Sequence, residues 1–152
     1  EKVLDLGFVG EPKRINPHIL GVLDQSDVIP VIAPIGVGEN GETYNINADT
    51  AAGAVAAAVG ASKLIMMTDI AGVLDSDDKL MPEITAEEAR GMIADGTIHG
   101  GMIPKIETCL NAIDHGTRSA TILDGRIPHV LLLETFTEHG VGTMIEGPAG
   151  QS

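Results

Sequence analysis

The stretch "YNINADTAAGAVAAAVGASKLIMMTD", residues 44–69, places a helix directly before a strand. The run of Ala, Gly and Val over about 48–60 predicts a helix, and small side chains on all its faces allow tight packing against a sheet or another helix. "KLIMMTD" is a continuous apolar run, which is typical of a strand buried in a sheet. A helix that leads straight into such a strand indicates an α/β fold.

The same alternation continues to the end of the chain. Helices are predicted in "ITAEEARGMIADG", "PKIETCLNAIDHG" and "HVLLLETF", and strands in "SATILDG" and "GTMIEG". Thr85 and Glu88 have the spacing of a capping box at the start of the first of these helices. The sequence therefore predicts one domain over residues 1–152, a three-layer αβα sandwich with a mostly parallel central sheet.

The first part of the chain has its own pattern. "KVLDLGFVGEPKRI" alternates at about period two and predicts an antiparallel ribbon, and Asn16–Pro17 predicts the start of a short helix over 16–25. "VIPVIAPIG", residues 28–36, predicts a strand buried on both faces. Asn40–Gly41 then predicts a hairpin turn.

Charge and cysteine content exclude several classes of protein. The 152 residues carry a net charge of −13, which argues against nucleic acid or an anionic membrane surface as the main partner. The single Cys109 excludes an internal disulfide framework and fits a reducing cytosol, so we expect a cytoplasmic location. Lys63 and Asp69 interrupt the longest apolar region, so no membrane span is expected, and no signal peptide is visible.

Three polar residues at every second position, Asn45, Asn47 and Asp49, precede the Ala-rich helix. In an extended segment residues two apart point the same way, so these side chains share one face that ends at a helix start. A helix needs one capping residue there. The two polar residues beyond this requirement favour a ligand site over the alternative, a capped helix that follows a polar hairpin.

A second candidate site lies in "HGGMIPK", residues 99–105, before another helix. Gly100 and Gly101 permit close approach of the backbone to a ligand. Lys105 falls in the first helical turn, where the helix dipole disfavours a cation unless a bound anion reverses the effect. A solvated surface lysine explains the sequence equally well.

Other motifs are weaker. "TDIAGVLD", residues 68–75, follows a predicted strand, and Asp69 with Gly72 marks either a ligand-binding turn or an ordinary connection. Gly36, Gly38 and Gly41 spell G-x-G-x-x-G, but an extended segment follows where a dinucleotide site requires a helix. The five His lack metal-ligand spacing, so no protein metal site is expected.

Four motifs together, "NINADTAA", "MMTDIAGVLD", "GGMIPK" and "LDGRIPHVLLLETFTEHGVGTMI", resemble the carboxyl-terminal half of the acetylglutamate kinases, which belong to the amino-acid-kinase family. The resemblance covers essentially the whole chain. Family chains are about twice as long, so the start at Glu1 resembles a cut end, with the amino-terminal lobe absent. The resemblance implies a nucleotide-binding lobe that serves phosphorylation of the side-chain carboxylate of N-acetyl-L-glutamate by ATP with Mg²⁺, in arginine biosynthesis.

Residue roles follow from the resemblance by position. Lys105 would neutralise charge on the transferring phosphoryl group, and Asp49 would hold the catalytic lysines. Asn45 would contact acetylglutamate and Asn47 would support that site. The residues that would line ATP or ADP are Asp69, Ile70, Ala71, Gly72, Val73, Leu74, Thr97, Ile98 and His99. The family's second catalytic lysine lies in the absent half, so we expect this piece to be inactive alone.

A regulatory site is also implied. Arginine-inhibited members use positions that match Glu134 and Gly140, but they usually have His where Thr121 stands, so inhibition by L-arginine stays open. Full-length members form homo-oligomers. The alternatives are the nucleotide-binding half of a glutamate 5-kinase or an aspartokinase, or a non-catalytic module that binds nucleotide or arginine and regulates a partner.

Overall fold

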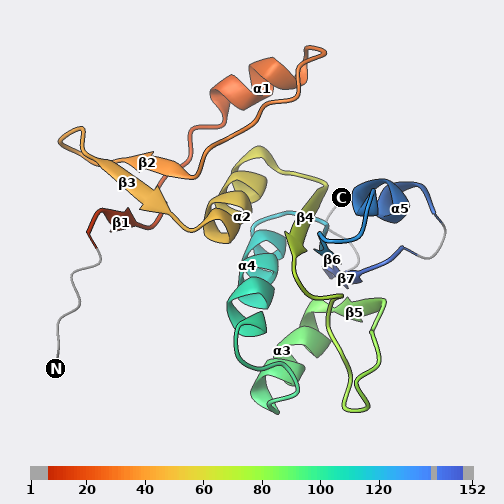
Figure 1. The fold of residues 1–152 in the computed structure, drawn as a ribbon. Helices are drawn as coiled ribbons and strands as arrows, with labels where there is room; N and C mark the ends of the chain where they lie inside the picture. Colours follow the sequence, from red (N-terminus) through yellow and green to blue (C-terminus); the bar gives the residue numbers. More distant parts are fainter. Residues whose placement is uncertain (1–6, 138–139, 149–152) are drawn as a thin grey trace, which may run out of the picture.

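The computed structural model describes residues 7–137 and 140–148, and Figure 1 shows their arrangement. The helices are α1 His18–Asp24, α2 Ala48–Val59, α3 Ala86–Ala94, α4 Met102–Asp114 and α5 Val130–Phe136. The strands are β1 Val9–Gly10, β2 Ile35–Val37, β3 Thr43–Ile46, β4 Lys63–Thr68, β5 Glu83–Thr85, β6 Ser119–Asp124 and β7 Thr143–Glu146.

A four-stranded sheet in the order β4-β6-β7-β5 forms the centre of the molecule. β4 pairs in parallel with β6, β5 pairs in parallel with β7, and only β6 with β7 is antiparallel. α2 and α4 lie on one side of this sheet and α5 on the other (Figure 1). The predicted αβα layering with a mostly parallel sheet is confirmed.

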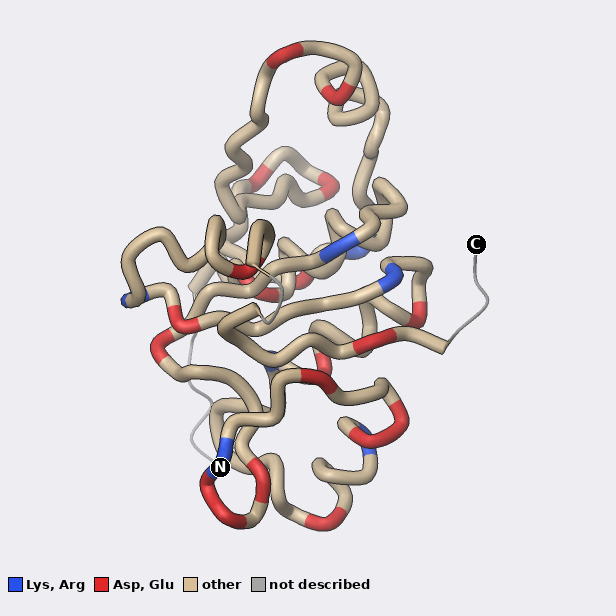
Figure 2. Tube along the Cα trace, turned by 90° about the vertical axis from the view of Figure 1, so that its right-hand side faces the viewer, with Lys and Arg blue, Asp and Glu red and all other residues tan. Residues whose placement is uncertain are grey.

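The core lies between the central sheet and its helices. Ile106 and Cys109 of α4 are fully buried against a sheet that contributes Ile122 and Ile145, also fully buried. Charged residues stay outside this core: in Figure 2 they follow mainly the loops and helices, and the middle of the sheet is nearly free of them. The capping box of Thr85 and Glu88 is confirmed, with both reciprocal hydrogen bonds present at the start of α3.

A second, three-stranded sheet lies in the part of the chain before α2, residues 7–46, which we call the arm. β2 and β3 form the predicted hairpin, and its turn places Gly41 at φ +89°, a conformation that glycine adopts without strain. The predicted antiparallel ribbon is wrong where the structure describes it. Val9–Gly10 pairs in parallel with Asn45–Ile46, and residues 2–6 of that ribbon lie outside the described residues.

The predicted buried strand over residues 28–36 is also wrong in this structure. Only Ile35–Val37 is a strand, and residues 28–34 have no regular structure. The side chains of Ile29 and Val31 are 88 % and 96 % exposed. The reason is that no strand within the described ranges pairs with this segment and nothing covers its side chains.

The predicted helix over 16–25 is confirmed as the shorter α1, with the side chain of Asn16 accepting a hydrogen bond from the His18 backbone. None of the helices in the described part of the chain has the length and apolar character that crossing a membrane requires.

Candidate functional site

The amino-terminal ends of α2 and α4 meet through an ion pair. Lys105 Nζ donates a hydrogen bond to Asp49 Oδ2 over 2.7 Å. The two side chains are 23 % and 33 % exposed, so the pair is half-buried but reachable from solvent. An acidic residue in the first turn of α2 and a basic one in the first turn of α4 therefore sit together, although 56 positions separate them in the sequence.

Close packing of α2 on α4 makes this meeting possible. A Cβ atom added to Gly53 of α2 would lie 2.6 Å from Cγ2 of Thr108 on α4, closer than real Cβ atoms approach. Gly53 and Ala56 are the buried residues of α2. The small side chains of this helix thus bring the two helix starts together, as the sequence suggested.

Asn47 is the cap of α2. Its Oδ1 accepts hydrogen bonds from the backbone of Asp49 at 2.9 Å and of Thr50 at 3.2 Å. One of the three alternating polar residues therefore has a structural role, which leaves the Asp49 carboxylate available for Lys105. Asn45 lies in β3, exposed and at a register position opposite Ile35.

A polar cavity of about 400 Å³ opens beside the ion pair. Its lining consists of Asn47, Asp49, Thr50, Gly101, Pro104, Lys105 and Thr108. Two regions selected from the sequence, the alternating polar residues and the "HGGMIPK" segment, therefore line one cavity. Asn45 is not among the lining residues. The cavity offers one cation paired with one carboxylate, together with amide and hydroxyl groups, a set suited to a polar ligand.

The 69–74 segment leaves the carboxyl end of β4. Asp69, Ile70 and Ala71 are exposed, whereas Val73 is buried in the core. Gly72 is buried against Thr143, whose hydroxyl accepts a hydrogen bond from the Val73 backbone over 2.8 Å. The side chains of Asp69, Ile70 and Ala71 can therefore contact a ligand, whereas that of Val73 cannot.

The 97–99 segment leads into α4. Ile98 is buried in the core, and Thr97 and His99 are more accessible. The His99 carbonyl accepts a hydrogen bond from the Met102 backbone at the start of α4. This segment is thus joined to the helix that carries Lys105, but neither it nor residues 69–74 line the cavity beside that lysine.

A charged cluster at the carboxyl ends of β4 and β6 contains Asp124 and Arg126, which the sequence analysis did not single out as site residues. The Arg126 guanidinium donates to both carboxylate oxygens of Asp124, at 2.9 and 2.8 Å. These hydrogen bonds hold the pKa of Asp124 at about 2, well below its usual range. They also raise the pKa of Arg126, to which the nearby charge of Asp69 adds. The signal in the sequence is the position of this loop directly after a predicted strand, because the residue types alone resemble an ordinary turn.

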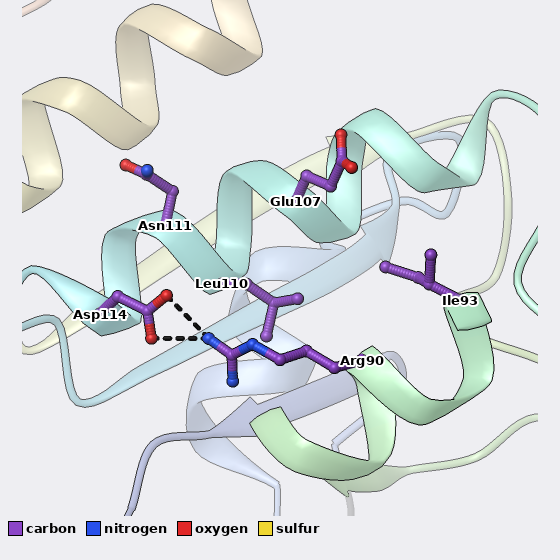
Figure 3. A pocket seen from close by; sticks show the side chains of 6 residues that line it. All are labelled: Arg90, Ile93, Glu107, Leu110, Asn111 and Asp114. Atoms are coloured by element: carbon purple, nitrogen blue, oxygen red, sulfur yellow. Dashed lines mark hydrogen bonds and ion pairs between the residues drawn. The ribbon is translucent and has the colours of Figure 1, made fainter.

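A second hollow, of about 330 Å³, lies between α3 and α4 (Figure 3). Arg90 of α3 donates to both carboxylate oxygens of Asp114 of α4, each over 2.7 Å. The guanidinium and the carboxylate neutralise each other, and their contact links α3 to α4. None of the residues predicted to form a site lines this hollow.

The two positions predicted for an arginine site are adjacent. Glu134 Oε2 accepts a hydrogen bond from the Val141 backbone over 2.9 Å, and Gly140 has φ +55°. A Cβ atom at Gly140 would lie 2.7 Å from Glu134 Oε2, so glycine leaves the carboxylate its space. Thr121 is fully buried in β6, and its hydroxyl has no hydrogen-bond partner among the described residues.

The sequence matches the profile of the amino acid kinase family over residues 2–124. The chain belongs to this family. The predicted membership is thus confirmed for most of the chain.

Similar curated proteins carry the name acetylglutamate kinase. The one from Rhodospirillum centenum is 63% identical over 145 residues, which are 95% of this chain and 48% of that protein. The one from Gluconacetobacter diazotrophicus is 64% identical over 147 residues, 97% of this chain and 47% of that protein. The chain therefore spans about half the length of the curated relatives it matches.

Solved structures share the fold. The N-acetylglutamate synthase from Neisseria gonorrhoeae, complexed with coenzyme A and L-arginine, matches with a TM-score of 0.88 and 26% identity, over 98% of this chain and 35% of that one. Carbamate kinase from Giardia lamblia bound to AMP-PNP matches with a TM-score of 0.58 over 75% of this chain and 37% of that one, at 19% identity, and shows the fold alone.

Two other features are the glycine pattern before α2 and the single cysteine. In the G-x-G-x-x-G pattern, Gly36 lies in β2 and Gly41 lies in the hairpin turn, and the extended segment predicted after it is confirmed as β3. Cys109 is buried in the core, and this burial is the main cause that raises the pKa of its thiol to about 12. Across the described ranges, no group of three or more His, Cys, Asp or Glu is placed to hold a metal ion.

Proposed function

We propose that this chain, over residues 1–152, is the ATP-binding, carboxyl-terminal half of an acetylglutamate kinase. The full-length enzyme would transfer a phosphoryl group from Mg²⁺-ATP to the side-chain carboxylate of N-acetyl-L-glutamate in the cytosol. Identities of 63% and 64% with acetylglutamate kinases favour this over a glutamate 5-kinase or an aspartokinase. The observation that carries the proposal is the Lys105–Asp49 pair in a polar cavity.

Phosphoryl transfer needs little covalent chemistry and depends on positioning and charge stabilisation. Lys105 meets the negative charge that grows on the transferring group, and Asp49, which accepts hydrogen bonds only, fixes the direction of that lysine. Asn47 uses its carbonyl oxygen for the helix cap, so its amide N–H groups are the part that supports the acetylglutamate site. Asn45 contacts that substrate directly.

The nucleotide binds along residues 69–74 and 97–99 in this proposal. Asp69, Ile70, Ala71, Leu74, Thr97 and His99 contribute side chains or backbone, whereas Gly72, Val73 and Ile98 are buried and contribute backbone groups alone. Magnesium arrives with ATP as part of the substrate, held by phosphate and water. The chain alone makes no acetylglutamyl phosphate, because a second catalytic lysine is not supplied by these residues.

Binding of two nucleotides tests the role of Lys105. If Lys105 meets the terminal phosphate, Lys105→Ala weakens binding of Mg²⁺-AMP-PNP by about tenfold or more, the value of a charged hydrogen bond, and changes Mg²⁺-ADP binding far less. Lys63→Ala is the control. Lys63 is exposed at the first residue of β4, the end away from residues 69–74, so its removal leaves both affinities unchanged. Equal losses for both nucleotides in calorimetric titrations would contradict this role, and no nucleotide binding at all would contradict the division into halves.

Turnover tests the reaction itself. In a full-length enzyme that carries these residues, Lys105→Ala lowers the turnover number by roughly 10²–10³ and changes the Michaelis constant for acetylglutamate little, because the interaction forms in the transition state. Asp49→Asn also lowers the turnover number, because Lys105 loses the carboxylate that fixes its direction. Unchanged turnover in both variants would reduce the pair to a structural contact.

A second role is suggested by the contact of Glu134 with the turn at Gly140. We propose that this carboxylate binds the guanidinium of L-arginine as a regulatory ligand, since the structurally similar synthase is complexed with L-arginine. L-arginine then raises the melting temperature of the chain, and Glu134→Gln removes that rise. A shift that persists in Glu134→Gln would place the ligand elsewhere.

A further inference from the structure

Thr143, the first residue of β7, is a fully buried threonine whose hydroxyl joins two other stretches of the chain. Its Oγ1 accepts a hydrogen bond from the Val73 backbone N–H over 2.8 Å and donates one to the Met81 carbonyl over 2.6 Å. The hydroxyls of two further buried threonines, Thr117 and Thr121, have no partner among the described residues. The two hydrogen bonds of Thr143 are therefore a particular feature of this position, rather than a general consequence of burying a threonine.

Val73 and Met81 lie opposite each other at the base of an antiparallel hairpin, residues 73–81, which is the yellow-green loop between β4 and β5 in Figure 1. Two residues that are opposite each other in this way usually exchange two N–H···O bonds. Here only one is direct, from the Met81 N–H to the Val73 carbonyl over 2.9 Å. The return bond passes through the Thr143 hydroxyl, which stands between the Val73 N–H and the Met81 carbonyl. The base of the hairpin is therefore tied to the central sheet.

Gly72, the residue before Val73, leaves room for this hydroxyl. A Cβ atom added to Gly72 would overlap Thr143 Oγ1 and would lie 2.8 Å from Cδ1 of Leu80. Any side chain at position 72 would thus displace either the hydroxyl or the segment that carries the new side chain. The glycine and the threonine therefore depend on each other, although 70 positions separate Val73 from Thr143 in the sequence.

The Thr143 hydroxyl fixes the far end of the segment along which the nucleotide is proposed to bind. At the near end, the Thr68 carbonyl accepts a hydrogen bond from the Gly125 N–H over 2.7 Å. Between these two points, no hydrogen bond within the described ranges involves the backbone of residues 70–72. The N–H and C=O groups of these three residues are thus available to a ligand, and their positions depend on how the two ends are held.

We propose that Thr143 is a positioning residue for nucleotide binding, which holds the backbone of residues 70–73 in the conformation that accepts ATP or ADP. Thr143 is fully buried, so it acts through the Val73 N–H and the Met81 carbonyl and does not touch the nucleotide. This inference rests on the proposed function, which assigns the nucleotide to residues 69–74. A hydroxyl that served stability alone would change the melting temperature and leave the nucleotide affinity of the folded chain unchanged.

Two substitutions at Thr143 separate positioning from packing. Thr143→Val keeps the size and shape of the side chain and removes the hydroxyl, whereas Thr143→Ser keeps the hydroxyl and removes a buried methyl group. We expect Thr143→Val to weaken Mg²⁺-ADP binding in calorimetric titrations by about tenfold, the factor for a segment that keeps its binding conformation in about one molecule in ten. Thr143→Ser retains the affinity of the unaltered chain, even though the lost methyl group lowers its melting temperature.

Thr117→Val is the matched control. It makes the same substitution at a buried threonine whose hydroxyl has no partner among the described residues, so it leaves the affinity for Mg²⁺-ADP unchanged. All titrations are made at a temperature at which circular dichroism shows each variant to be folded. Equal affinities of Thr143→Val and the unaltered chain would overturn the inference and leave the proposed function standing. A loss in Thr143→Ser as large as that in Thr143→Val would also overturn it, because packing would then be the cause.

Hydrogen exchange tests the same arrangement in the unaltered chain, so it does not depend on the folding of a variant. Without nucleotide, the Val73 amide is protected and the amides of residues 70–72 exchange freely. Saturating Mg²⁺-ADP slows exchange at residues 70–72 by about tenfold or more. A Val73 amide that exchanges as fast as its three predecessors would overturn the inference. An unaltered chain that binds no Mg²⁺-ADP would contradict the proposed function itself and this inference with it, a result distinct from a failure seen only in the variants.

Discussion

The arm, residues 7–46, and the body, residues 48–146, both contain long apolar runs, but only the body buries them. "KLIMMT" in β4 has Leu64 and Met66 in the core, whereas "VIPVI" in the arm is exposed along its length. β4 has β6 beside it and α2 packed on it, and residues 28–34 have neither within the described ranges. An apolar run thus predicts that a segment is buried. Whether the segment is buried in the structure depends on the strands and helices that pack against it.

The two regions also differ in how local their contacts are. In the body, each helix returns onto a strand close to it in sequence, as α2 does onto β4. In the arm, β3 pairs with β2 and with β1, and these three strands contact mainly one another. We therefore expect the free energy of unfolding of this chain to come from the body.

The largest expected effect compares one isoleucine from each region. Ile106 is fully buried in the body, so Ile106→Ala lowers the free energy of unfolding by about 2–5 kcal/mol. Ile29→Ala removes a side chain that contacts little in the isolated chain, so its effect stays within about 0.5 kcal/mol. Urea denaturation measures both. Similar losses in the two variants would show that the arm is packed in solution.

A smaller effect tests the packing of α2 on α4 within the body. Gly53→Ala gains about 1 kcal/mol of helix propensity but forces a Cβ against Thr108, a clash that costs about 1–3 kcal/mol. Thr108 yields poorly because its hydroxyl donates to the Pro104 carbonyl over 2.9 Å. We expect a net loss of about 1 kcal/mol.

Gly91→Ala is the matched control, since nothing lies near its added methyl group in α3. It gains about 0.5–1 kcal/mol. Thermal melts of the two variants would move in opposite directions. A stabilising Gly53→Ala would mean that the two helices are further apart than the structure places them, and the Lys105–Asp49 contact would then lose its support.

The smallest effect concerns acid stability at the rim of the body. The pKa of Asp124 is lowered to about 2, so its carboxylate stabilises the fold above the ordinary pKa of 3.8. This contribution is lost as the pH falls from about 4 to about 2, because the unfolded chain binds the proton first. Arg126→Ala removes the main cause of the shift, so its melting temperature falls less steeply than that of the unaltered chain across that range.

Lys79→Ala serves as the control for this pH series. Its ion pair with Asp77 is exposed and 3.7 Å long, and such pairs contribute little. The variant follows the unaltered chain at every pH. A profile for Arg126→Ala that matches the unaltered chain as well would mean that the Asp124–Arg126 contact does not persist in solution.

Local features of this chain were predictable from the sequence alone. The Thr85–Glu88 capping box, the hairpin at Asn40–Gly41 and the extent of α2 all depend on hydrogen bonds between residues a few positions apart. Alternating helices and apolar strands were enough to predict the layered α/β fold. The residue types at the helix starts also marked both halves of the candidate site.

The tertiary structure decided what depends on distant partners. It joined Asp49 to Lys105 and assigned the helix cap to Asn47. It revealed the ion pair between Arg126 and Asp124, whose sequence is that of an ordinary turn. It also left residues 28–34 uncovered, although their sequence predicts burial. The physical reason is the same in each case: a hydrogen bond within one turn needs only its own segment, whereas burial and ion pairing need a second surface that the segment does not encode.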